Sequence, residues 1–158
     1  IFRIKGRDPK KPMSFVCADL THISRFARVS NVAYRILKRF LPGPYTFVLE
    51  ANSEVPKMLL TKQKTVGIRI PDHAISNALV RELGNPILST SANLSGAEPL
   101  TDPRDIQDVL GKQVDMILDC GVLTNVPSTV ISLLGDEVQV LREGPGDIAF
   151  FRDLEKNG

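Results

Sequence analysis

The sequence predicts an α/β (α+β) fold, in which a twisted, mixed, open sheet carries flanking helices. Short apolar strand sequences alternate with amphipathic helical sequences through most of the chain, and strand sequences then cluster towards its end. The composition, 42% hydrophobic and 24% charged, is that of a globular domain, and 158 residues are enough for one. No apolar run reaches the roughly 18 residues that a membrane span needs, so we expect no membrane contact.

In the first half of the chain, each strand sequence is followed by helical sequence. We expect strands at 13–19, 45–51 and 65–71, and helices at 20–30, 31–41, 53–60 and 73–83. The first two helices place apolar residues on one face, with Asp19 or Thr21 able to cap the first and Asn31 the second. The sequence PGP at 42–44 should end the second helix.

The second half of the chain begins within an amphipathic helix. Gly84 should end that helix, whose apolar face consists of Ile75, Ala78, Leu79 and Leu83. We then expect strands at 86–91, 115–121, 128–134 and 137–144, and a helix at 101–111. Thr101 or Asp102 can cap this helix, and Pro103 suits its first turn. A tight turn at 134–137 should join the last two strands as a hairpin.

Charge is unevenly distributed along the chain, although the net charge is only +2. Residues 1–40 carry ten Lys or Arg and two Asp, whereas the remainder carries ten Lys or Arg and sixteen Asp or Glu. A basic first quarter predicts an anionic partner, either a nucleotide or an RNA backbone. The alternative is that several of these cations only form solvated helix surfaces, namely Arg25, Arg28, Lys38 and Arg39.

The few cysteine and histidine residues indicate no metal site. Cys17 and Cys120 stand far apart without CxxC spacing, which is typical of two buried, reduced thiols in a cytoplasmic protein. His22 and His73 are isolated and are not expected to bind a metal.

The stretch LSTSANLSG at 88–96 concentrates small hydrogen-bonding residues at the end of an expected strand. These are Ser89, Thr90, Ser91, Asn93 and Ser95. The composition alone is common in surface loops. The alternative is a cradle for phosphate or carboxylate oxygens, because open α/β sheets bind ligands at the carboxyl ends of their strands.

Cations and hydroxyl groups recur at the ends of other expected strands. Arg69 lies in an otherwise apolar strand, Arg142 lies near the end of the last one, Ser128 and Thr129 begin another, and Lys5-Gly6-Arg7 opens the chain. Taken singly, these residues could lie at a sheet edge, in a turn or in solvent. Together they predict one concave site with two to four cations, suited to a nucleoside triphosphate.

The chemistry expected of this site is electrostatic stabilisation and positioning of a substrate. The sequence contains no GxxxxGK[ST] phosphate-binding loop, and neither histidine lies near a nucleophile motif. Covalent catalysis is therefore not expected. A purely structural domain would explain neither Arg69 nor the clustered hydroxyl groups.

Seven segments, in this order, resemble the YrdC/YciO family. They are KGRDPKKP (5–12), LPGPYTFVL (41–49), TVGIRIPDH (65–73), PILSTSANLSG (86–96), VDMILDCG (114–121), PSTVISL (127–133) and VLREGPGD (140–147). The resemblance implies a twisted α/β sheet with a large, positively charged cavity. It also implies synthesis of threonylcarbamoyl-adenylate from threonine, bicarbonate and ATP, with magnesium expected beside the ATP and pyrophosphate released.

The resemblance also assigns roles to residues and to partners. The family's K-x-R and S-x-N signatures map onto Lys5, Arg7, Ser91 and Asn93, which are the implied catalytic residues. The implied nucleotide-binding residues are Thr65, Arg69, Ser89, Ser91, Asn93, Ser128 and Arg142. In the family, partner proteins transfer the threonylcarbamoyl group to an adenosine of certain tRNAs, and double-stranded RNA binding has also been linked to it.

Two features depart from the pattern of the enzymes in this family. Full-length members begin with a further segment that includes a TDTVYG-like sequence, which helps to hold threonine, and no stretch here matches it. We therefore expect 1–158 to be a single YrdC-like domain lacking its N-terminal part. Residues 14–38 look closer to the YciO branch, so the alternative is a nucleotide- or double-stranded-RNA-binding protein without synthase activity.

Overall fold

The computed structural model describes residues 1–157 except 10, 61, 125 and 136, so Lys10 of the basic first quarter and one position of the expected turn at 134–137 lie outside it. The chain divides into two compact units. Unit 1 consists of Ile1–Lys11 and Thr90–Val126, and unit 2 consists of Pro12–Ser89 and Pro127–Gly158. That the two units form one domain stays a prediction.

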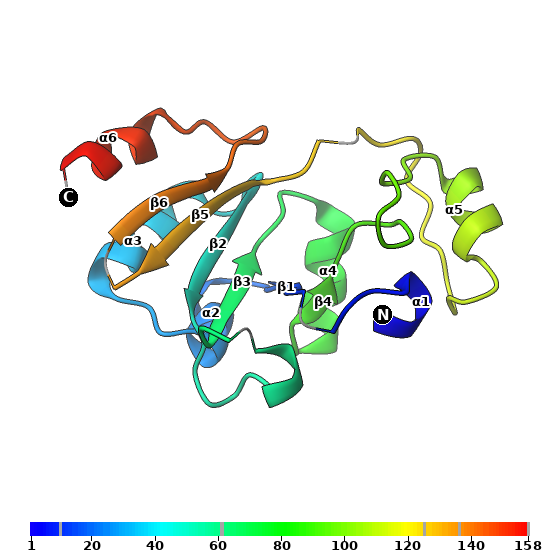
Figure 1. Cartoon of the computed structure of the whole chain (residues 1–158), viewed down its shortest axis with the longest axis horizontal. Coiled ribbons are helices and arrows are strands. Elements are labelled where there is room, and N and C mark those ends of the chain that lie inside the picture. The colour runs from blue at the N-terminus through cyan, green and yellow to red at the C-terminus, as the bar shows by residue number, and fades with distance from the viewer. Residues whose placement is uncertain (10, 61, 125, 136, 158) are drawn as a thin grey trace. The chain divides into compact units, whose positions relative to one another are not determined.

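Unit 2 is built on a six-stranded sheet with the order β4-β1-β3-β2-β5-β6 (Figure 1). Its strands are β1 (Ser14–Val16), β2 (Tyr45–Glu50), β3 (Thr65–Arg69), β4 (Ile87–Ser89), β5 (Thr129–Leu134) and β6 (Glu137–Arg142). The β1–β3 and β2–β5 pairs are parallel, and the other three pairs are antiparallel. The mixed open sheet confirms the predicted fold class, and β5 and β6 form the predicted hairpin.

The register of the sheet separates an apolar face from a polar one. Phe15, Ile68, Phe47 and Ile131 stand side by side across four strands, and all are almost fully buried. One position along, Ser89, Ser14, Gly67, Val48 and Ser132 form the neighbouring row on the opposite face. We call these the core face and the polar face of the sheet.

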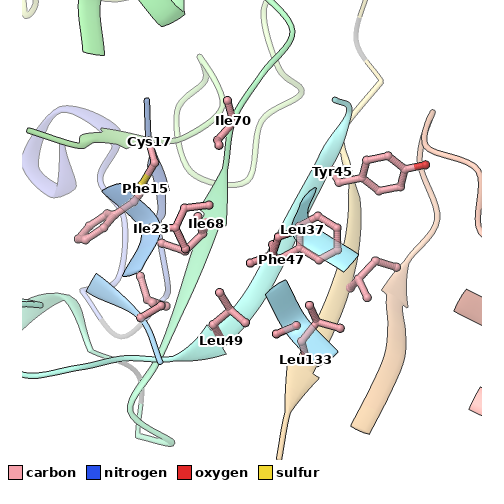
Figure 2. Packing of buried hydrophobic residues seen from close by; sticks show 14 of the residues in the cluster. Phe15, Cys17, Ile23, Leu37, Tyr45, Phe47, Leu49, Ile68, Ile70 and Leu133 are labelled. Carbon is pink, nitrogen blue, oxygen red and sulfur yellow. The ribbon is translucent and has the colours of Figure 1, made fainter. Parts of the chain in front are cut away.

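Three helices complete the core against the sheet. They are α2 (Leu20–Phe26), α3 (Asn31–Phe40) and α6 (Ala149–Asn157). Ile23 and Leu37 pack into the same cluster as Phe47 and Leu49, as Figure 2 shows. Phe151 of α6 joins the cluster through Phe40, with ring centroids 4.6 Å apart.

Side-chain caps fix where α2 and α3 begin. The Asp19 carboxylate accepts the His22 amide at 2.7 Å, as predicted. The cap of α3 is Ser30, whose hydroxyl accepts the Ala33 amide at 3.1 Å, and not Asn31. Asn31 is itself the first helical residue, so its side chain lies one position too late to reach the free amides.

Three other elements of unit 2 differ from the sequence prediction. The helix expected at 53–60 is reduced to the 3-10 turn η1 (Lys57–Leu59). Helix α4 (Ala74–Leu83) forms and ends at Gly84, but it packs through Val80. Its expected apolar face is exposed, at 42% for Ile75, 44% for Leu79 and 56% for Leu83. Helix α6 was not predicted at all.

The described residues of unit 1 form two helices, one in each of its two segments, and the rest of these residues lie in loops and turns. These helices are α1 (Phe2–Lys5) and α5 (Pro103–Leu110), and Asp102 caps α5 as predicted. The strand expected at 115–121 does not form: Met116 and Leu118 are 74% and 53% exposed, and no ladder pairs with this stretch within the described residues. Apolar sequence alone does not make a strand, because its backbone groups also need a neighbouring strand to bond with.

Candidate functional site

The polar face of unit 2 brings together Arg69 and Arg142, which end different strands. Arg69 follows the core residue Ile68 in β3, so its side chain belongs to the opposite face. Arg142 of β6 pairs with Val130, which stands one position from the core residue Ile131. Burial, and then the nearby positive charge of Arg142, lower the pKa of Arg69. The two guanidinium groups therefore repel each other at this site.

The chain itself orients Arg142. Its Nε and Nη2 groups donate to the carbonyl oxygen of Ser128, at 3.1 and 2.8 Å. The Ser128 hydroxyl in turn lies 2.8 Å from the hydroxyl of Thr46, which belongs to the polar face of β2. Two hydroxyl groups thus stand beside an exposed cation whose direction is fixed.

Arg69 has no anionic partner within the described part of the chain. Its side chain is half-buried, and its Nε atom is buried without a hydrogen bond to any described residue. No described carboxylate forms an ion pair with Arg69 or Arg142. A buried guanidinium with unused donors is costly, and an anion bound on the polar face would relieve both the desolvation and the repulsion.

Residues 144–146 are fitted tightly against the start of β5, beside the arginine pair. A Cβ atom on Gly144 would lie 2.3 Å from the carbonyl oxygen of Pro127 and 2.6 Å from the amide nitrogen of Thr129. The Thr129 hydroxyl donates to the Gly146 carbonyl at 3.0 Å and accepts the Gly146 amide at 2.9 Å. These contacts hold the backbone that presents Ser128 to Arg142.

A second cluster, in unit 1, is centred on Lys5. Helix α1 ends there, and Gly6 then adopts the left-handed conformation with φ at 58°. Lys5 is only 5% exposed, and its ammonium group donates to the carbonyl oxygens of Ser91 and Asn93 and to Oδ1 of Asn93, each at 2.6 Å. Burial, and then the charge of Arg7, lower the pKa of Lys5.

The polar side chains of the S-x-N sequence are also bonded to one another and to their own loop. The Ser91 hydroxyl donates to Oδ1 of Asn93 at 2.7 Å, and Nδ2 of Asn93 donates to the Ala97 carbonyl at 2.6 Å. Arg7 is half-buried, whereas Lys5 is buried. The K-x-R pair therefore combines one enclosed cation with one that reaches the surface of unit 1.

The residues predicted from the sequence thus gather in two clusters. Lys5, Arg7, Ser91 and Asn93 lie in unit 1, and Arg69, Ser128 and Arg142 lie in unit 2. Ser89 and Thr65 also belong to the polar face, although Thr65 is buried. That both clusters line one cavity stays a prediction, as do the individual roles of these residues.

Thr46 is a site residue that the sequence analysis missed. It is buried at 6% exposure and bonds to Ser128. The signal was present, because Thr46 is a polar residue between Tyr45 and Phe47, whose side chains belong to the core face.

Within the part of the chain that the structure describes, no group of three or more His, Cys, Asp or Glu could hold a metal ion. Both cysteines are free, and Cys17 is buried as expected. The expected burial of Cys120 was wrong, because the stretch that contains it forms no strand in the sheet and leaves the thiol exposed. No helix among the described residues is long and apolar enough to cross a membrane.

Comparison with known proteins identifies the family to which this open sheet and its basic clusters belong. Residues 1–144 match the model of the Sua5/YciO/YrdC family, whose description reads "Telomere recombination". The chain therefore belongs to this family. The uncharacterized protein YciO of Escherichia coli K12 is 44% identical over 153 residues, which cover 96% of this chain and 74% of YciO. A putative threonylcarbamoyl-AMP synthase of Methanocaldococcus jannaschii is 36% identical over 146 residues, covering 91% of this chain and 68% of that protein.

Solved structures agree with this assignment. The crystal structure of E. coli YciO matches with a TM-score of 0.88 over 96% of this chain and 74% of that one. The crystal structure of Pyrococcus abyssi Sua5 complexed with L-threonine matches with a TM-score of 0.89 and 30% identity, over 97% of this chain and 46% of that one. The fold is therefore shared by YciO and by a threonine-binding Sua5 protein.

Proposed function

We propose that the protein is a nucleotidyltransferase that forms threonylcarbamoyl-AMP from ATP, threonine and bicarbonate. The amino group of threonine first takes up bicarbonate to give a carbamate and water. An oxygen of the carbamate then attacks the α-phosphorus of ATP, the bond between the α-phosphorus and its bridging oxygen to the β-phosphorus breaks, and pyrophosphate leaves. The product would serve the threonylcarbamoyl modification of tRNA, with transfer by partner proteins.

The observation that carries this proposal is the arginine pair on the polar face of unit 2. Arg69 and Arg142 present two neighbouring cations, no described carboxylate neutralises them, and the hydroxyls of Ser128 and Thr46 stand beside them. A polyphosphate would meet bidentate donors there, and its charge would offset their repulsion. Mg²⁺ would enter bound to ATP, since Mg²⁺ is usually held by substrate phosphates together with few protein ligands.

The residues contribute to the transfer by positioning and electrostatics. In this proposal Arg69 and Arg142 hold phosphate oxygens and stabilise the charge that develops on pyrophosphate as it leaves. Arg7, in unit 1, is a further cation to which this proposal assigns contact with an anion. Threonine as the amino acid is proposed because this chain is similar to Sua5, which has been crystallised with L-threonine.

The test is an assay of the chain with ATP, Mg²⁺, bicarbonate and threonine, following pyrophosphate release and detecting threonylcarbamoyl-AMP by mass. We expect product that requires all three substrates. Arg142→Met should reduce turnover by about a hundredfold, the loss expected from one transition-state donor. The matched control is Arg152→Met, which removes an arginine already paired with Glu143 and Glu155 and should leave turnover unchanged.

A second candidate function is binding of double-stranded RNA without synthase activity. The observation that favours it is the solvent-exposed basic side of α3, with Arg35, Lys38 and Arg39. ATP binding without product, combined with an RNA affinity that falls steeply with salt and weakens in Arg35→Gln, would support this function in place of synthesis.

A further inference from the structure

The ammonium group of Lys5 has no donor left for a ligand. An ammonium carries three N–H bonds, and Lys5 makes three hydrogen bonds of 2.6 Å to the loop that contains Ser91 and Asn93. Its side chain is 5% exposed, and no described carboxylate pairs with it. The charge is therefore enclosed by neutral oxygen atoms that belong to a single loop.

The backbone joins the same two segments. The Ser95 amide donates to the Lys5 carbonyl at 2.8 Å, and the Leu100 amide donates to the Ala92 carbonyl at 2.8 Å. Within the loop, Asn93 bridges Ser91 and Ala97 through its side-chain amide. Residues 90–100 contain no regular helix or strand, so no ladder or helical hydrogen bonds add to these contacts. The shape of this loop thus depends on a few polar contacts, and three of them come from one ammonium group.

We propose that Lys5 is a positioning residue, which fixes the conformation of loop 91–97 through its three hydrogen bonds and does not itself bind the nucleotide. Arg7, whose side chain reaches the surface of unit 1, is then the member of the K-x-R pair that meets an anion. The part of this inference that concerns ATP rests on the proposed function. The part that concerns the loop does not.

Removing the ammonium should loosen the loop in a measurable way. In Lys5→Met the three loop oxygens lose the ammonium group as a donor, while the volume and apolar stem of the side chain are largely kept. Amide hydrogen exchange in residues 91–97 should then be at least about tenfold faster, the factor that corresponds to one lost charged hydrogen bond. Lys5→Arg should behave in the same way, because a planar guanidinium cannot place three donors as an ammonium does.

The matched comparison is Arg7→Met. It should leave exchange in 91–97 unchanged and weaken ATP binding, measured by calorimetry, by at least about tenfold. In Lys5→Met, unchanged exchange in the loop combined with a loss of ATP affinity as large as that in Arg7→Met would overturn the proposal. Near-normal ATP affinity in Lys5→Arg with a protected loop would also overturn it, since charge alone would then be sufficient.

A measurement on the unaltered protein covers the case in which the Lys5 variants do not fold. A threefold-bonded, buried ammonium should give a ¹⁵N–¹H signal that exchanges slowly with water, and saturating ATP should not change that exchange. An ammonium signal lost to fast exchange would contradict the inference. If the unaltered protein binds no ATP, the proposed function fails, while loop exchange and the ammonium signal still decide the role of Lys5.

Discussion

Replacing Arg69 by methionine tests whether its charge serves the fold or a ligand. The substitution removes a half-buried guanidinium whose Nε has no hydrogen-bond partner among the described residues, and it keeps a long apolar stem. Because no described ion pair is lost, we expect Arg69→Met to lower the free energy of unfolding by less than about 1 kcal/mol. If the guanidinium group of Arg69 instead stabilised the fold, its removal would lower the free energy of unfolding by a larger amount.

The expected effect on binding is larger. One hydrogen bond to a charged group contributes about 1.5–3 kcal/mol, which corresponds to roughly 10- to 150-fold in affinity. Arg69→Met should therefore weaken ATP binding by about that factor at fixed ionic strength, measured by titration calorimetry, with urea denaturation of the same samples giving the stability. Arg28→Met is the matched control, because Arg28 is a surface arginine 3.8 Å from Glu50. It should change neither quantity appreciably.

One combination of results would show that Arg69 serves the fold and not a ligand. If Arg69→Met lowered the free energy of unfolding by about 3 kcal/mol or more and left ATP affinity within twofold of the unaltered protein, Arg69 would be a structural residue. The proposed function would then lack one of the two arginines on which it depends for binding ATP.

Three further predictions concern stability and reactivity. His22 is buried and accepts the Ala18 amide through Nδ1 at 3.3 Å, and burial, followed by the charge of Arg25, lowers its pKa below 6.5 in the folded state. As the pH falls, the unfolded chain takes up this proton first, so the urea midpoint should be constant above pH 7 and fall as the pH drops through 6.5. His22→Leu should flatten this decline between pH 7.5 and 5.5, and an equally steep decline in the variant would contradict the prediction. Gly144→Ala should lower the free energy of unfolding by about 2–3 kcal/mol, because the new methyl group meets backbone atoms of Pro127 and Thr129 that cannot rotate away. If calorimetry shows that the free energy of unfolding falls by less than about 0.5 kcal/mol, the loop around Gly144 can move to admit the methyl group. Burial, and then the negative charge of Asp19, raise the pKa of Cys17 to about 12. Iodoacetamide at pH 8 should therefore modify the exposed Cys120 in the native protein and Cys17 only after unfolding. Mass spectrometry that shows both cysteines alkylated in the native protein would contradict the burial of Cys17.

Elements with strong internal periodicity were predicted well from the sequence. The alternation of Tyr45, Phe47 and Leu49 with Thr46 and Val48 identifies a strand with two different faces, and the structure forms it as β2. The same alternation accounts for a charged residue at the end of the apolar β3, since an arginine there can stand on the polar face. Local pattern was sufficient in these cases because each strand finds partners in the sheet.

Other elements depended on information that a local pattern does not contain. Residues 115–121 are apolar enough for a strand, but pairing is decided by distant segments, and none of the described residues pairs with them. The predicted packing face of α4 was wrong for a related reason, since Val80 is buried and the apolar side with Leu79 and Leu83 is exposed. Helix α6 does have a signal in the sequence, with Asp147 before its start and with Leu154 at helical spacing from both Phe150 and Phe151.

The site residues were found largely by resemblance, whereas their bonding was not predictable. Lys5 and Asn93 are 88 positions apart, and nothing in the sequence indicates that the ammonium group spends all its donors on that loop. The pairing of Arg142 with the Ser128 carbonyl was likewise invisible, because a main-chain acceptor leaves no trace in the residue types.

The two-faced sheet of unit 2 links correct folding to the presence of the arginine pair. A slip of β3 by one position against β1 and β2 would turn Ile68 out of the core and bring Arg69 into contact with Phe15 and Phe47. Such a misaligned chain would be unstable and would also lack the cation on its polar face. Molecules that unfold in the native cooperative transition are therefore ones that carry the arginine pair on the polar face, and the fraction of the sample that unfolds in that transition reports the fraction able to bind.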